Sequence, residues 1–98
     1  MHISFVGHHI SVTPALKAFT EEKLQKLERH VEMISSIHVV FSLEKLQQVV
    51  EATVNVGKFE VHARSEAEDM YAAVDGLIAK LDRQLLKHKE ILEERREH

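Results

Sequence analysis

Residues 47–65 read QQVVEATVNVGKFEVHARS, and this stretch decides the fold. Apolar and polar residues alternate on both sides of Gly57, as they do when successive side chains point to opposite faces of a strand. The apolar set is Val50, Ala52, Val54, Val56, Phe59, Val61 and Ala63, and the polar set is Glu51, Thr53, Asn55, Glu60, His62 and Arg64. The pattern predicts two strands joined by a turn at Gly57, each with one buried and one exposed face.

Two further strands and a helix are predicted on the N-terminal side. Residues 1–7 and 35–45 alternate in the same way, with His2, Ser4, His38 and Ser42 on the polar face. Between them, Thr13 is a good N-cap and Pro14 suits the first helical position, where a missing N–H costs nothing. The apolar positions that follow recur at spacings of three and four: Leu16, Phe19, Thr20, Leu24, Leu27 and Val31.

A second helix is predicted after the last strand. Ser65 as N-cap and Glu68 at the third helical position form a capping box, so the helix is expected to start there and end near residue 92. Its apolar positions are Met70, Val74, Leu77, Ile78, Leu81 and Leu85. Residues 93–98 have mixed charge and are predicted to be a frayed tail of a single domain that spans residues 1–98.

The order of elements is β-α-β-β-β-α, and it defines the fold class. Every strand has one apolar face and both helices are amphipathic, so the economical packing places both helices on one face of a single sheet. We therefore predict an α+β two-layer sandwich, a four-stranded sheet with two helices on one face.

Composition excludes several kinds of chemistry. The chain has 98 residues and no cysteine, which excludes disulfides, zinc–thiolate sites and thiol catalysis. It shows neither a signal peptide nor an apolar run long enough for a membrane span. With 13 Lys and Arg against 16 Asp and Glu, the net charge is −3, so an anion must be bound by a segregated patch.

Two groups of residues raise the question of an enzyme or a metal site. Glu66, Glu68, Asp69 and Asp75 have no cation among them, but three of these acids are predicted to lie in the first helical turn, where the helix dipole favours negative charge. The eight histidines show none of the paired spacings of metal ligands, although on an open sheet face they could also contact RNA bases. We predict no enzymatic activity, no metal and no cofactor.

The cations are arranged more specifically. At about 100° per residue, Lys80, Arg83 and Lys87 fall within roughly 60° of one another beside the apolar face of the last helix, and Lys89 follows. Gly76 lies on the same stripe one turn earlier. Lys23, Lys26 and His30 run beside the apolar face of the first helix, so the two stripes are predicted to border one groove. A solvated helix face is the alternative; the scarcity of acids at spacings of four favours a surface that binds an anion.

The last helix carries a recognisable signature. DMYAAVDGLIAKLDRQLLKHK, residues 69–89, closely resembles the last helix of the ribosome hibernation promoting factors, a family also called ribosome-associated inhibitor A or sigma-54 modulation proteins. VTPALKAFTEEKLQKLE resembles the first helix of that family, and EATVNV and VHA resemble its third and fourth strands. The resemblance extends over nearly the whole chain.

The resemblance implies a fold close to that of double-stranded-RNA-binding domains, and a function. Family members bind the small ribosomal subunit in stationary phase, over the decoding region, where they block messenger and transfer RNA. The family's RNA-contacting positions correspond to Lys23, Lys26, Lys80, Arg83, Lys87 and Lys89. Asp69, Tyr71 and Asp75 match its acid and aromatic signature, and Arg64 is a further candidate on the open sheet face.

Length and partners complete what the resemblance implies. The chain has the length expected of the short family members, which act with a separate ribosome modulation factor to pair ribosomes into inactive dimers. The expected partners are the small subunit and its 16S ribosomal RNA, with no membrane and no small-molecule substrate. The free protein is expected to be a cytoplasmic monomer. A protein-interaction module that modulates a transcription factor (sigma-54) is the alternative.

Overall fold

Four strands, a short 3-10 helix and two α-helices form the computed structural model, which describes residues 1–29 and 33–96, with side chains as far as residue 90. In chain order they are β1 (His2–Gly7), α1 (Pro14–Gln25), the 3-10 helix η1 (Lys26–Arg29), β2 (Ile34–Glu44), β3 (Gln47–Val56), β4 (Phe59–Ala67) and α2 (Met70–Arg96). The predicted order β-α-β-β-β-α and the α+β class are confirmed.

The strands form one sheet in the order β1-β2-β3-β4. β1 is parallel to β2, while the other two pairs are antiparallel. Gly57 has a φ of 56° in the turn between β3 and β4, a left-handed conformation that suits glycine. Because the strand order is β1-β2-β3-β4, the two edge strands of the sheet are β1 and β4.

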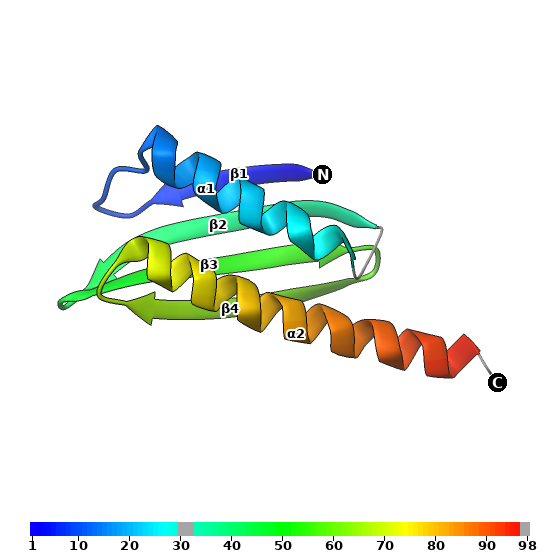
Figure 1. Cartoon of the computed structure of the whole chain (residues 1–98). Helices are drawn as coiled ribbons and strands as arrows, with labels where there is room; N and C mark the ends of the chain where they lie inside the picture. The colour runs from blue at the N-terminus through cyan, green and yellow to red at the C-terminus, as the bar shows by residue number, and fades with distance from the viewer. Residues whose placement is uncertain (30–32, 97–98) are drawn as a thin grey trace.

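Both helices cover the same face of the sheet, α1 near β1 and β2 and α2 along β3 and β4 (Figure 1). The core between the two layers contains the apolar sets predicted from alternation and helical spacing, with Ile37, Val39, Phe41, Leu77 and Leu81 fully buried. Leu43 was predicted to point into this core but is 49% exposed. The hairpin between β2 and β3 extends past the start of α2 (Figure 1), and Leu43 is the second-last residue of β2 at this end of the sheet.

The start of α1 agrees with the sequence prediction. The Leu16 N–H donates to Thr13 Oγ1 at 3.2 Å, and Pro14 is the first helical residue. The buried Thr20 hydroxyl donates to the Leu16 carbonyl at 2.8 Å, which allows a polar residue in an apolar row. The α-helix ends at Gln25 and continues as η1, whereas Val31, also predicted on this row, lies outside the described residues.

The predicted capping box of α2 is wrong. Ser65 belongs to β4, where it pairs with Val50, and the strand continues to Ala67. The helix starts at Met70, and Asp69 caps it: its Oδ1 accepts from the Tyr71 N–H at 3.4 Å and its carbonyl from the Ala73 N–H at 3.0 Å. Cross-strand pairing therefore outweighed the local capping signal.

The C-terminal end of α2 also differs from the prediction. The helix continues to Arg96 instead of ending near residue 92, so residues 93–96 are helical. Residues 97 and 98 lie outside the described part of the chain. None of the helices in the described residues is long and apolar enough to cross a membrane.

Candidate nucleic-acid interface

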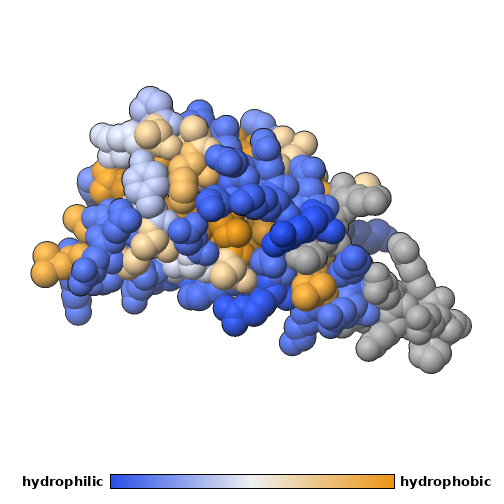
Figure 2. Space-filling view, viewed as in Figure 1, coloured by the Kyte–Doolittle hydropathy of each residue, from blue (hydrophilic) through white to orange (hydrophobic). Residues whose placement is uncertain are grey.

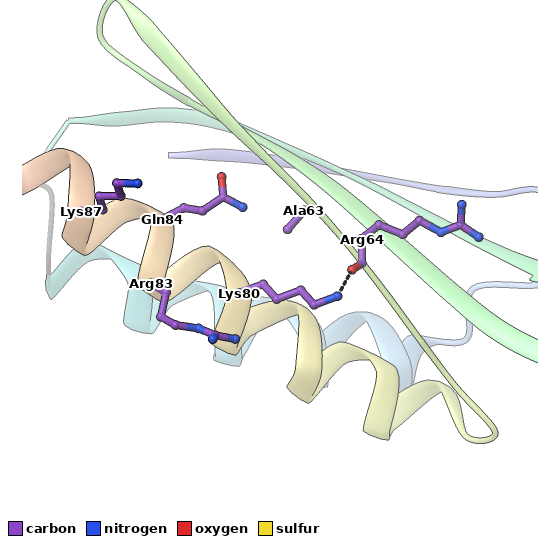
Figure 3. Close-up of a pocket in the computed structure, with 6 residues that line it drawn as sticks. All are labelled: Ala63, Arg64, Lys80, Arg83, Gln84 and Lys87. Atoms are coloured by element: carbon purple, nitrogen blue, oxygen red, sulfur yellow. Dashed lines mark hydrogen bonds between the residues drawn. The ribbon is translucent and has the colours of Figure 1, made fainter.

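A cationic recess lies between the edge strand β4 and the adjacent flank of α2. It has a volume of about 460 Å³ and is lined by Ala63, Arg64, Lys80, Arg83, Gln84 and Lys87 (Figure 3). We call Lys80, Arg83 and Lys87 the basic row. All three are exposed. A neighbouring hollow is lined by Arg64, Ser65, Glu66 and Lys80, so Lys80 is the member of the row that shares a hollow with an acid.

Two side chains of α2 reach across the recess to the backbone of β4. Lys80 Nζ donates to the Arg64 carbonyl at 2.6 Å, and Gln84 Nε2 donates to the His62 carbonyl at 2.9 Å. An ammonium group carries three N–H donors, so Lys80 retains two for a ligand. Figure 3 shows the first of these contacts and also shows that Arg83 and Lys87 make no hydrogen bond to the residues drawn.

The same flank of α2 lies very close to β4. A Cβ atom at Gly76 would lie 2.6 Å from Ser65 Oγ, a distance that real side chains do not adopt. Gly76, seen in the sequence only as an open position on the basic stripe, therefore permits the close packing of helix and strand.

Arg64 contributes its carbonyl to the recess but points its guanidinium elsewhere (Figure 3). Arg64 Nη2 donates to the Glu44 carboxylate, and Glu66 lies 3.7 Å away. The hydrogen bond and the negative charge of Glu44 raise the pKa of Arg64. The positive charge of the guanidinium is thus balanced by these carboxylates on the open face of the sheet, away from the basic row.

On the opposite flank of α2, one cation of α1 and one of η1 lie near acids. Lys23 Nζ is 3.8 Å from Asp75 Oδ1 and 5.3 Å from the centre of the Phe19 ring. In η1, Arg29 Nη2 is 3.4 Å from Asp82 Oδ1. Because these acids of α2 stand between the two sets of cations, the prediction that both stripes border one groove is wrong.

None of the remaining predicted site residues lies on the basic row. Lys26 is exposed at the start of η1, while Lys89 is half-buried and, nine residues after Lys80, projects from the other side of α2. Tyr71 is 38% exposed and packs edge-on against Phe19, with ring centres 5.0 Å apart. Asp69 acts as the helix cap described above.

Two histidines on the open face of the sheet, His38 and His62, are hydrogen-bonded to neighbouring hydroxyl groups. Ser4 Oγ lies 2.7 Å from His38 Nδ1, and Thr53 Oγ1 lies 3.0 Å from His62 Nδ1. Within the described residues, no group of three or more His, Asp or Glu side chains is arranged to hold a metal ion. These histidines join strands within the sheet.

Sequence reasoning missed Gln84. Its signal was present, because Gln84 lies four residues after Lys80 and therefore projects from the same side of the helix. What the sequence could not show was that this side faces the edge of β4.

The helical face as a whole is largely hydrophilic, with small apolar patches between charged side chains (Figure 2). The fold and the recess define an α+β sandwich with a concentrated basic row at one edge of the sheet. The chain matches the family described as "Sigma 54 modulation protein / S30EA ribosomal protein" over residues 3–93. It belongs to this family, which confirms the resemblance seen in the sequence.

Similar proteins have been identified in several bacteria. The chain is 52% identical over 90 residues to a ribosome hibernation promoting factor of Azotobacter vinelandii, covering 92% of this chain and 84% of that protein. It is 43% identical over 94 residues to the protein of that name in Escherichia coli K12, covering 96% of this chain and 99% of the relative.

Solved structures share the fold. A ribosomal subunit interface protein from Coxiella burnetii is 39% identical, with a TM-score of 0.88 over 92% of this chain and 99% of the other. The N-terminal domain of Thermus thermophilus Protein Y is 28% identical, with a TM-score of 0.83 over 90% of this chain and 99% of that domain.

Proposed function

We propose that this protein is a ribosome hibernation factor that binds the small ribosomal subunit in the cytoplasm during stationary phase. The basic row contacts phosphates of 16S ribosomal RNA near the decoding region, and the folded body occupies the space of messenger and transfer RNA. Inhibition is steric and requires no catalysis. Binding also promotes inactive ribosome dimers, with ribosome modulation factor as a possible second component. The names of the relatives support a role on the ribosome.

The observation that carries this proposal is the basic row itself. Arg83 and Lys87 are exposed beside a recess lined by no carboxylate, and Lys80 is held in place by the Arg64 carbonyl with two donors remaining. Cations positioned in this way suit phosphate oxygens, which fix the position of a protein on nucleic acid without reading its sequence. RNA helices are recognised largely through shape and such backbone contacts.

The test is co-sedimentation of the Arg83→Glu/Lys87→Glu variant with purified small subunits. Neither side chain has a hydrogen-bond or ion-pair partner among the described residues, so the variant is expected to fold. We expect it to leave the small-subunit fraction. The matched control is Lys45→Glu/Lys58→Glu, which makes the same change in charge at the two exposed hairpin turns. A folded Arg83→Glu/Lys87→Glu variant that sediments like the control excludes the basic row as the binding surface.

Dependence on salt provides a second measure. Each phosphate contact contributes roughly 0.7 to 0.9 to the slope of log K against log salt concentration. The unmodified protein should therefore bind small subunits with a steep slope, which the variant loses.

The alternative function is a protein-interaction module that acts on a transcription factor, as the first half of the family description indicates. The same basic row would then contact an acidic protein surface. Affinity capture from stationary-phase cells separates the two: under the ribosomal proposal, nuclease treatment removes the captured partners. Capture of a transcription factor that survives nuclease, without ribosomal proteins, supports the alternative.

A further inference from the structure

The row of residues Gly76, Lys80, Gln84 and His88 runs along β4 at intervals of four. Gly76 lies against Ser65, Lys80 donates to the Arg64 carbonyl, Gln84 donates to the His62 carbonyl, and His88 stacks on Phe59 with ring centres 4.3 Å apart. We call this the edge row. Its partners follow β4 backwards because α2 runs antiparallel to the strand (Figure 1).

The repeat of the helix matches the repeat of the strand. Four helical residues advance about 6 Å along the axis, and two strand residues advance about 6.6 Å. Lys80 and Gln84 therefore meet successive outward carbonyls, those of Arg64 and His62. The match places one polar donor on each of two adjacent carbonyls, those of Arg64 and His62, that the strand would otherwise present to a neighbour.

β4 is an edge strand of nine residues, and such edges pair readily with other strands. Alternate residues of an antiparallel strand turn both their N–H and their C=O groups to the same side. The side away from β3 therefore carries the backbone groups of His62 and Arg64, and by alternation those of Glu60 and Glu66.

The charges of β4 are complementary to a second copy of the same strand. If two copies pair antiparallel about a two-fold axis at His62, Glu60 of each copy lies opposite Arg64 of the other. Opposite charges directly across a strand pair stabilise it, and a two-fold arrangement satisfies each pair twice. The charges on the β4 edge are therefore complementary to those on the same edge of a second copy.

We propose that the β4 edge is a docking surface for the β4 edge of a second copy of this chain, and that Lys80 and Gln84 keep it closed in the free protein. Their side chains occupy two of the acceptors that the new strand pair would use, including the carbonyl of His62 at its centre. Strand addition of this kind joins separate chains through main-chain hydrogen bonds. The proposal is independent of ribosome binding, since it concerns the free protein.

The test is sedimentation velocity of Lys80→Ala/Gln84→Ala over a wide concentration range. We expect the average mass to rise with concentration toward twice that of the monomer, while the unmodified protein remains monomeric. Arg83→Ala/Lys87→Ala is the control: it removes two cations from the same recess but no donor to β4, and should remain monomeric. Lys80→Arg/Gln84→Lys, which keeps both donors, should also remain monomeric.

A further substitution identifies the surface. His62→Pro removes an N–H that faces away from β3, so the ladder within the sheet is kept, and adding it should return the dimer to a monomer. If Lys80→Ala/Gln84→Ala fails to fold, Lys80→Met/Gln84→Leu keeps the apolar contacts and carries the test. A folded variant that is monomeric at every concentration, or a dimer that persists with His62→Pro, overturns the proposal.

Discussion

Cations border both flanks of α2, but on one flank two of these cations lie beside acids. On the flank beside β4, Arg83 and Lys87 are exposed and lie near no acid in their recess. On the flank beside α1, Lys23 lies by Asp75 and Arg29 by Asp82. A cation that already has a carboxylate partner has less to gain from a phosphate. Cations that contribute equally to the net charge of the chain therefore differ in whether an acid lies beside them.

The two flanks are also joined to their neighbours differently. Outside the apolar core, α2 contacts β4 through hydrogen bonds to the strand backbone and the close approach at Gly76, whereas it contacts α1 and η1 through an aromatic edge contact and exposed ion pairs. Exposed ion pairs contribute little to stability. On the β4 flank the hydrogen bonds therefore fix the position of Lys80 beside the strand, with Arg83 and Lys87 exposed next to it.

The largest expected difference is between alanine substitutions on the two flanks. Losing two phosphate contacts at about 0.1 M salt should weaken binding by roughly 10- to 100-fold, and we expect this for Arg83→Ala/Lys87→Ala. Lys23→Ala/Lys26→Ala should cost clearly less, because Asp75 already lies beside Lys23. Filter binding to small subunits at several salt concentrations measures both. Equal losses and equal changes in slope would remove the distinction between the flanks.

Removal of an acid should have a smaller effect in the opposite direction. Asp75→Asn removes the charge beside Lys23 and leaves the ammonium available. Since an exposed ion pair is worth about 0.2–1 kcal/mol, affinity should rise by about 1.4- to fivefold. The same filter-binding assay tests this, with Glu22→Gln, an exposed acid of α1 without an ion-pair partner among the described residues, as the control for net charge. A weaker complex would show that Asp75 itself supports binding.

The close packing at Gly76 predicts a coupling in stability. Gly→Ala within a helix gains about 1 kcal/mol from backbone propensity, but in Gly76→Ala the new Cβ meets Ser65 Oγ. In the Ser65→Ala background that atom is absent and the nearest carbon is 3.7 Å away, so the gain should be realised there. Urea unfolding of the two single variants and the double variant measures the coupling, expected to be at least about 0.5 kcal/mol. Strict additivity would contradict the close approach.

The smallest expected effect belongs to Arg64. Its guanidinium donates to Glu44 on the open face of the sheet, so Arg64→Ala should change small-subunit binding by less than twofold. The measurement is the same binding curve, with Arg83→Ala as the matched arginine on the basic row. A loss as large as that of Arg83→Ala would place RNA on the open face as well.

Much of this protein follows from the sequence alone. Alternation about Gly57 and apolar spacing in the helices determined the class, the order of elements and the face that is buried, because burial of apolar surface is the dominant favourable term in folding. Thr13 and Pro14 correctly predicted the start of α1 through purely local contacts. The signature of residues 69–89 identified the family.

Only the tertiary structure decided the rest. Ser65 carries a good local signal for a helix start, yet pairing with Val50 keeps it in β4. The basic row and the cations of α1 look alike along the chain, and only packing shows that Asp75 and Asp82 separate them. The match between Lys80, Gln84 and the carbonyls of β4 depends on residues about twenty positions apart. Local sequence encodes which face of an element is apolar, whereas the neighbour on each flank is set by how the layers pack.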